Sequence, residues 1–222
     1  MRSPIFRTGG LPKARVEAFS DGVLAIVITL LVIEFHVPAE LVSDGALAGA
    51  LLHLLPLAAA WAVSFVFVLT FWVSHHYFFS SLARCDKGLL WLNGLFLMAI
   101  TLLPFATGLV GEYPSGRIPV IVLSAVMLVA SLSFALMRYY ALHYAKLLRP
   151  EAAASQGTMV WVQSAGAPLA YALAIVFGFI WTPAAYVIQA LVLVAYVVRS
   201  PSQFASAHDE IDASLESSSS GS

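Results

Sequence analysis

Long apolar runs separated by short polar segments dominate the chain, and their lengths predict six membrane-spanning helices. A helix needs about 20 apolar residues to cross the hydrocarbon core of a bilayer. We expect the spans at 16–35, 52–79, 88–110, 118–139, 158–180 and 184–198, with a short loop after Pro38 and a tight turn at Trp181-Thr182-Pro183. The pattern therefore predicts an all-α membrane protein.

Composition supports this class and removes several others. Of the 222 residues, 60% are hydrophobic and only 10% are charged, whereas soluble domains have about 45–50% and about 25%. The formal net charge of −1 gives no reason to expect a nucleic-acid partner. The single cysteine, Cys85, excludes an internal disulfide and a metal site built from several cysteines.

Basic residues predict how the chain lies in the membrane. If the N-terminus is cytoplasmic, every Lys and Arg except Arg117 falls inside, which is a strong positive-inside bias. Both termini are then expected in the cytoplasm of a cell with the protein in its inner (plasma) membrane. We divide the chain into a cytoplasmic segment 1–14, a transmembrane domain 15–199 and a polar tail 200–222, expected to be disordered and to end in a cloning remnant.

The first span interrupts its apolar run with the polar tetrapeptide Phe19-Ser20-Asp21-Gly22. A carboxylate near the centre of a bilayer costs about 2.5 to 3.5 kcal/mol on insertion scales, so we expect Asp21 to face protein or water. At about 100° per residue, one stripe of this helix holds Phe19, Gly22, Ile26, Thr29, Leu30 and Ile33, and the opposite side holds Asp21, Leu24 and Ile28. No second copy of the tetrapeptide occurs, so a symmetric pathway built from this helix would need several subunits.

The residues at this point resemble a known family. Arg15-x-x-x-Phe19-Ser20-Asp21-Gly22, followed by Ala25-Ile26 and Thr29-Leu30, is similar to the first-helix signature of the bacterial members of the transmembrane protein 175 family. The animal members of that family are endolysosomal potassium channels. Further similar segments lie within residues 15–113: Trp72-x-x-His75-His76, Leu92-Asn93, Leu103-Pro104-Phe105 and Gly111-Glu112-Tyr113.

The resemblance implies a homotetrameric cation channel of six-helix subunits, with potassium preferred modestly over sodium and with no cofactor or resident metal. The first helix of each subunit would line the pore, with Ile26 as a hydrophobic constriction, Thr29 as a hydroxyl layer, and Leu30 and Ile33 as further apolar rings. A structural polar network would combine Arg15, Ser20, Asp21, Trp72, His75, His76 and Asn93. Expected partners are potassium ions, the lipid bilayer and further copies of the chain.

Simpler interpretations and other functions remain open at this point. The stripe can be a packing face, the Thr29 hydroxyl can bond the carbonyl four residues earlier, and Asp21 can form a structural ion pair with Arg15. A proton-coupled secondary transporter would use Asp21 with His75 and His76 as a relay, although no sequence repeat supports it. An intramembrane enzyme would need Ser64, Ser74 or His75, but no GxSxG or HExxH motif accompanies them.

Overall fold

A computed structural model describes residues 12–37, 43–154 and 158–198. Most of the predicted N-terminal segment, the loop after Pro38 and the tail from residue 199 onward lie outside the described residues, as do the side chains of 151 and 154–163. The described part is helical, and it contains one isolated β-bridge, between Leu82 and Leu148. Within this described part, four helices are long and apolar enough to cross a membrane.

The first predicted span is α1 (Lys13–Leu30) followed by the 3₁₀ segment η2 (Leu31–Glu34). The helix begins after Pro12, whose fixed φ suits the residue before a first turn. The two segments form one continuous, mostly apolar rod, Lys13–Glu34. Its charged residues are Lys13, Arg15, Glu17 and Asp21 near the beginning and Glu34 at the end. The location and length of the first span are therefore confirmed.

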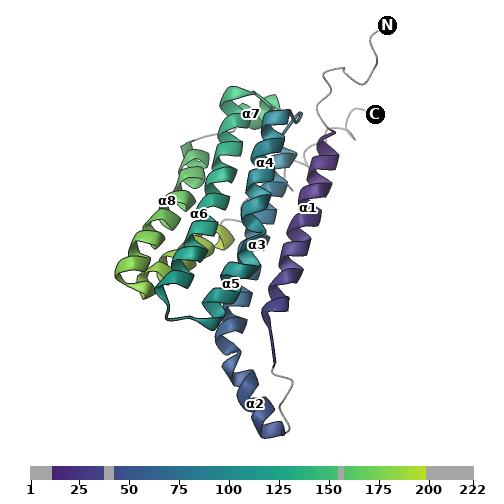
Figure 1. The fold of residues 1–222 in the computed structure, drawn as a ribbon. Coiled ribbons are helices and arrows are strands. Elements are labelled where there is room, and N and C mark those ends of the chain that lie inside the picture. Colours follow the sequence, from purple (N-terminus) through teal and green to yellow (C-terminus); the bar gives the residue numbers. More distant parts are fainter. Residues whose placement is uncertain (1–11, 38–42, 155–157, 199–222) are drawn as a thin grey trace, which may run out of the picture.

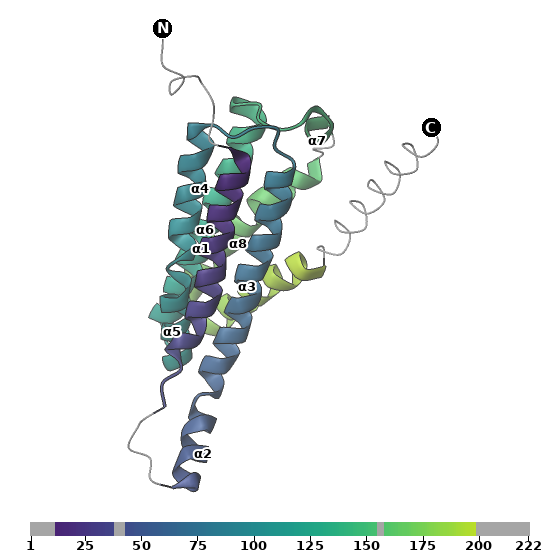
Figure 2. The ribbon, with the colours of Figure 1, turned by 90° about the vertical axis from the view of Figure 1, so that its right-hand side faces the viewer.

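The second span is α3 (Leu55–Ser80), and a separate helix, α2 (Asp44–His53), precedes it. The Ser43 hydroxyl caps α2 by accepting a hydrogen bond from the Ala46 N–H at 3.2 Å. Pro56 lies in the first turn of α3, where its missing N–H leaves no gap in the helix. Figures 1 and 2 show that α2 extends beyond the rest of the bundle, where the sequence predicted only a short loop or half-turn.

The third span is divided into α4 (Lys87–Ile100) and α5 (Leu103–Glu112). Asp86 caps α4 by accepting a hydrogen bond from the Leu89 N–H at 2.8 Å. Pro104 lies in the first turn of α5, so it cannot donate the hydrogen bond that would continue α4. The span predicted at 88–110 is confirmed as Lys87–Glu112, and the break between α4 and α5 inside it was not predicted.

The remaining described chain is α6 (Arg117–Tyr139), the π-helical turn η3 (Tyr140–Tyr144), α7 (Pro150–Ala154), α8 (Thr158–Ile180) and a last helix, Thr182–Val198. The turn at Trp181 falls where the sequence predicted it. Within the described part, the last two apolar helices, Ser164–Ile180 and Thr182–Val198, are shorter than the other spans.

The helices pack as a bundle with α1 at its edge (Figure 1). Against α1 lie α3, α4 and α5, while α6 packs between α4 and α8. Large side chains that are fully buried, among them Phe79, Phe96, Leu24 and Met127, fill the centre. We call the end of the bundle where α1 begins and α3 ends the inner end, and the opposite end the outer end.

Backbone hydrogen bonds tie two loops together at the inner end. The Ala83 N–H donates to the Leu147 carbonyl at 2.8 Å, and the Arg149 N–H donates to the Ser81 carbonyl at 3.0 Å. The Lys13 ammonium, at the start of α1, donates to the Leu82 carbonyl at 3.4 Å. These contacts connect the first helix to the α3–α4 turn and that turn to the segment after α6. We call them the loop clamp.

Candidate functional site

The two sides of α1 differ sharply in exposure. Leu24, Val27 and Leu31 are buried in the bundle, whereas Ile26 keeps 59% of its surface exposed. Exposed with Ile26 are the other members of the predicted stripe, Phe19, Gly22, Thr29, Leu30 and Ile33. A Cβ placed on Gly22 would meet no atom within 4 Å. In a single chain the stripe is therefore open along its whole length.

The one hydroxyl on the stripe has a defined orientation. Thr29 Oγ1 donates to the Ile26 carbonyl at 2.8 Å, a bond to the residue three positions earlier rather than four. A hydroxyl has one proton and two lone pairs. Because the proton is directed back into the helix, the oxygen lone pairs of this exposed side chain remain free to accept or to coordinate.

The 3₁₀ segment changes how the outer part of the stripe is aligned. A 3₁₀ helix has 3.0 residues per turn, so residues i and i+3 eclipse, and it rises about 2.0 Å per residue. Ile33 therefore lies almost directly beyond Leu30, about 6 Å farther along the axis, and both are exposed. Had α1 stayed α-helical, Ile33 would be rotated by about 60° away from Leu30.

A buried chain of hydrogen bonds links α3, α4 and α1 near the inner end. His75 Nε2 lies 2.9 Å from Asn93 Oδ1, Asn93 Nδ2 donates to Ser20 Oγ at 2.9 Å, and Ser20 Oγ donates to the Val16 carbonyl at 2.9 Å. A carbonyl oxygen can only accept, so His75 carries its proton on Nε2 and donates. All three polar side chains are almost completely buried.

Aromatic rings hold the imidazole of His75 in place. The ring of Phe79 stacks on it with centroids 4.2 Å apart, and the ring of Phe96 lies parallel at 5.9 Å. The ring contacts with Phe79 and Phe96 and the hydrogen bond to Asn93 together hold His75 in one orientation. This histidine is built into the core as a hydrogen-bond donor.

A second polar group lies beside the first and contains Asp21. The Trp72 indole N–H donates to Asp21 Oδ1 at 2.9 Å, and the Trp72 ring stacks on His76 with centroids 5.9 Å apart. Asp21 and Trp72 are both exposed in a single chain. Within one subunit, the hydrogen-bond partner of the Asp21 carboxylate is therefore the Trp72 indole.

Arg15 joins neither group within the described residues, where its side chain has no hydrogen bond or ion pair. Six residues separate Arg15 from Asp21, which is about 600° of helical rotation, so the two side chains leave α1 about 120° apart. An ion pair between them inside one chain, the simple interpretation of the sequence, is therefore absent from the described part. Arg15 instead continues the stripe, seven residues before Gly22.

Ser64, one of the two serines considered for an intramembrane enzyme, forms a buried contact between two helices. The hydroxyls of Ser64 and Thr107 are hydrogen bonded to each other at 2.7 Å, both are buried, and Thr107 Oγ1 also lies 2.8 Å from the Leu103 carbonyl. This pair joins α3 to α5. Among the described residues, no three His, Cys, Asp or Glu side chains are grouped as they would be to hold a metal ion.

Some contacts that position α4 were not predicted. Besides capping α4, Asp86 accepts a hydrogen bond from the Tyr140 hydroxyl at 2.8 Å. That hydroxyl lies so close to Gly88 that a Cβ there would overlap it. The Asp-Lys-Gly sequence at 86–88 is a recognisable helix start, but nothing in the sequence indicates that Tyr140 closes over it.

The protein is a bundle of apolar helices with two polar groups near its inner end and an open, largely apolar stripe on α1. These features define a multi-pass helical membrane protein. The family model for the endosomal/lysosomal potassium channel TMEM175 matches residues 15–104. A protein named as a potassium channel from Chamaesiphon minutus is 38% identical over 170 residues, covering 75% of this chain and 84% of the relative. The chain belongs to the TMEM175 family, as a bacterial member.

Two further comparisons agree with this membership. A protein from Streptomyces collinus, also named as a potassium channel, is 34% identical over 192 residues and covers 83% of this chain and 91% of its own length. The crystal structure of a lysosomal potassium-selective channel TMEM175 homologue from Chamaesiphon minutus superposes with a TM-score of 0.73 at 34% identity, covering 85% of this chain and 97% of that one.

Proposed function

We propose that the protein is a potassium channel that passes potassium in preference to sodium through a pore lined by α1. The single observation that carries this proposal is the open stripe of α1, which the bundle leaves uncovered from Phe19 to Ile33. The relatives named as potassium channels support the choice of ion. Four copies around one axis would bring four such stripes together, with α8 and the last helix as the fifth and sixth spans and both termini in the cytoplasm.

Ile26 is proposed as the narrowest ring. A ring of apolar side chains that excludes water offers an ion no replacement for its hydration shell, so the cation that is less strongly hydrated passes more easily. This ordering favours potassium over sodium, but only modestly. Leu30 and Ile33, which the 3₁₀ geometry aligns, would add two further apolar rings toward the outer end.

Thr29 is proposed as the polar layer of the pore. Its proton is bonded to the Ile26 carbonyl, so the negative end of the hydroxyl dipole is the part left exposed on the stripe. Four such oxygens would replace part of the hydration shell of a passing cation. The same hydrogen bond keeps the side chain in one rotamer, which a ring of ligands requires.

The two polar groups are proposed to fix the inner half of α1. Ser20 is bonded through Asn93 to His75, and Asp21 is bonded to Trp72, so two adjacent residues of α1 attach to α3 and α4 on neighbouring sides of the helix. Attachment at two points resists rotation of α1 about its axis. That would keep Ile26 directed at the pore.

Ion flux into liposomes tests the proposal directly. Ile26→Asn should wet the constriction, raise cation flux and lower the preference for potassium, whereas Thr29→Val should lower the preference and leave the constriction in place. Ile118→Asn, at an exposed position on α6, is the matched control and should change neither. If flux and selectivity of assembled Ile26→Asn protein equal those of the parent, Ile26 does not face the pore.

The same assay separates the channel from the transporter. A channel gives currents that reverse at the equilibrium potential of potassium, while a proton-coupled carrier gives flux that follows the proton gradient. Within the described residues, no hydrogen bond connects Asp21 to His75 or His76. A continuous relay through these three side chains would need such a connection.

A further inference from the structure

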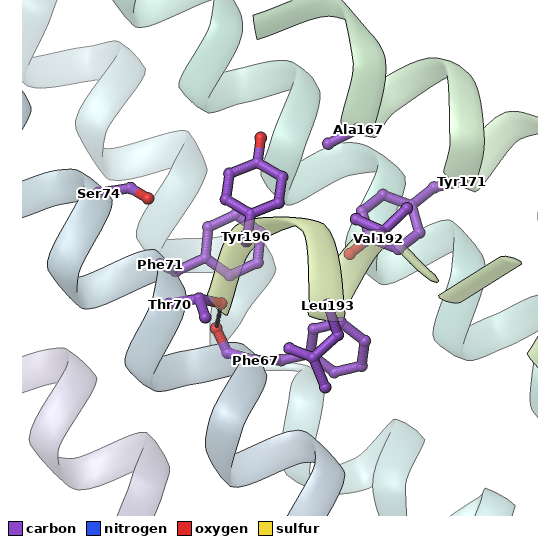
Figure 3. Close-up of a pocket in the computed structure, with 9 residues that line it drawn as sticks. All are labelled: Phe67, Thr70, Phe71, Ser74, Ala167, Tyr171, Val192, Leu193 and Tyr196. Carbon is purple, nitrogen blue, oxygen red and sulfur yellow. Dashed lines mark hydrogen bonds between the residues drawn. The ribbon is translucent and has the colours of Figure 1, made fainter. Parts of the chain in front are cut away.

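A narrow crevice opens between α3, α8 and the last helix, well away from the stripe of α1 (Figure 3). Its volume is about 290 Å³, including the open mouth. The lining is mostly apolar and aromatic, with Phe67 and Phe71 from α3, Tyr171 from α8, and Leu193 and Tyr196 from the last helix. Only about 20 Å³ of this space is deep enough to hold the centre of a water-sized molecule. The crevice is therefore a shallow open groove, which suits a thin chain lying along it better than an enclosed globular ligand.

Hydroxyl groups without partners lie in the wall of the crevice. Tyr171 is only 2% exposed, yet its hydroxyl forms no hydrogen bond with the described residues. In Figure 3 this hydroxyl points from α8 toward the last helix. The Ser74 hydroxyl, also in the lining, has no partner among the described residues either. Neither hydroxyl oxygen is among the fully buried polar atoms that lack a partner, so both stay accessible, and a ligand that carries ester or phosphate oxygens would supply an acceptor.

A positive charge lies at the inner side of the same region. Arg138 of α6 is half-buried, and its guanidinium is close enough to Tyr196 for the two side chains to interact electrostatically. Among the described residues it has no hydrogen bond and no ion pair. An unpaired arginine within a membrane span is costly, and such residues normally find an anionic partner.

The depths of these groups match the shape of a lipid. Arg138 is six residues before the end of η3, about 9 Å along the helix from the inner end. Ser74 and Phe67 are 6 and 13 residues before the end of α3, about 9 and 20 Å from the same end. The charge is therefore level with the inner rim of the crevice, and the apolar lining extends toward the bilayer centre.

We propose that this crevice binds an anionic phospholipid of the inner leaflet, with the phosphate on the Arg138 guanidinium and one acyl chain between α3, α8 and the last helix. The guanidinium fork matches two phosphate oxygens, which a lysine ammonium cannot do. The Ser74 hydroxyl, which lies at about the same depth as Arg138, donates to an oxygen of the ester region. The lipid joins the last helix to the bundle, so its retention stabilises the protein.

Native mass spectrometry of the full-length protein, purified in mild detergent and mixed with phosphatidylglycerol or phosphatidylcholine, measures the binding. We expect the parent protein to bind phosphatidylglycerol about tenfold or more tightly than phosphatidylcholine, and Arg138→Gln to lose this preference. Arg138→Lys should keep a part of it. Arg149→Gln, which removes an exposed basic residue at the same end, is the matched control and should behave as the parent does.

Several results would overturn the proposal. One is a loss of phosphatidylglycerol preference in Arg149→Gln as large as that in Arg138→Gln. That result would mean that anionic lipid is attracted to the basic residues of the inner end in general and not to one specific site. A second is displacement of the lipid by millimolar inorganic phosphate, which would identify a free-anion site. A third is Arg138→Gln protein that dissociates into single chains whichever lipid is present, since the arginine would then pair with a second copy. If Arg138→Gln does not fold, the lipid preference of the parent and of Arg138→Lys decides.

Discussion

The hydrogen bond between Asn93 and Ser20 joins α4 to the pore-lining helix, and Ser20→Ala removes it with almost no change in volume. The Asn93 N–H is then left in a buried site without an acceptor. Hydrogen bonds between membrane helices average about 0.6 kcal/mol in double-mutant cycles and reach about 1.7 kcal/mol. Because both partners are buried and Asn93 also holds His75, we expect the upper part of that range, a loss of about 1 to 1.7 kcal/mol in the free energy of unfolding.

Ser133→Ala is a matched control for this measurement. Ser133 is as deeply buried as Asn93, but its hydroxyl donates only to the Val129 carbonyl four residues earlier at 2.7 Å. Ser20 makes the same local bond, to Val16, in addition to the one from Asn93. The difference between the two variants therefore isolates the bond between helices, and Ser133→Ala should change the free energy of unfolding by less than about 0.5 kcal/mol.

Unfolding in mixed detergent and sodium dodecyl sulfate micelles, followed by tryptophan fluorescence, gives the free energies. A double-mutant cycle with Asn93→Leu then gives the coupling between Ser20 and Asn93. Equal destabilisation by Ser20→Ala and Ser133→Ala, together with a coupling near zero, would refute the reasoning. The polar chain would then contribute nothing to holding α1 on the bundle.

Three further results are expected. Asp21→Asn keeps an oxygen for the Trp72 indole and should lower the free energy of unfolding less than Asp21→Ala does. We expect Asp21→Ala to cost up to about 1 kcal/mol, because the pair is exposed, and the same micelle titration measures both. Gly111→Ala places a Cβ 2.7 Å from the α3 backbone and should cost about 1 to 3 kcal/mol, whereas Gly94→Ala meets nothing within 4 Å and should be neutral or stabilising in thermal unfolding. Burial raises the pKa of the Cys85 thiol, so less of it is thiolate at neutral pH. Maleimide should therefore label Cys85 more slowly than free cysteine, and the labelling rate should keep increasing at pH values where the rate for a free thiol has levelled off. Labelling should be complete only in denaturant.

The apolar pattern predicted where helices run but not where they break. The turn at Trp181 was predicted because Pro183 and a change of apolar run mark it. Leu103-Pro104 lies inside one long apolar run, so its effect on the hydrogen bonds of α4 could not be separated from a simple kink. Ser43 is a good helix cap, but α2 contributes no buried residue, and burial is what the apolar pattern detects.

The candidate site was predicted residue by residue, but its connections were not. Periodicity placed Leu24 and Ile26 on opposite sides of α1 correctly, because one helix determines that relation. The bond from Ser20 to Asn93 joins residues 73 positions apart, and only the packing of α1 against α4 decides it. Arg15 was grouped with this network by resemblance, and its role stays a prediction because its side chain faces away from the bundle in one chain.

Because of the loop clamp, the inner end of the bundle should open locally less readily than the outer end. At the inner end, the amides of Ala83 and Arg149 are bonded across two loops that are more than 60 residues apart in the chain, so neither loop opens without the other. Loop amides normally exchange with solvent quickly because they open locally, whereas amides in a shared cooperative unit exchange together and more slowly. At the outer end, α2 buries no residue of its own. Deuterium uptake should therefore spread from the outer end, and the loops at the inner end should be among the last parts of the chain to exchange.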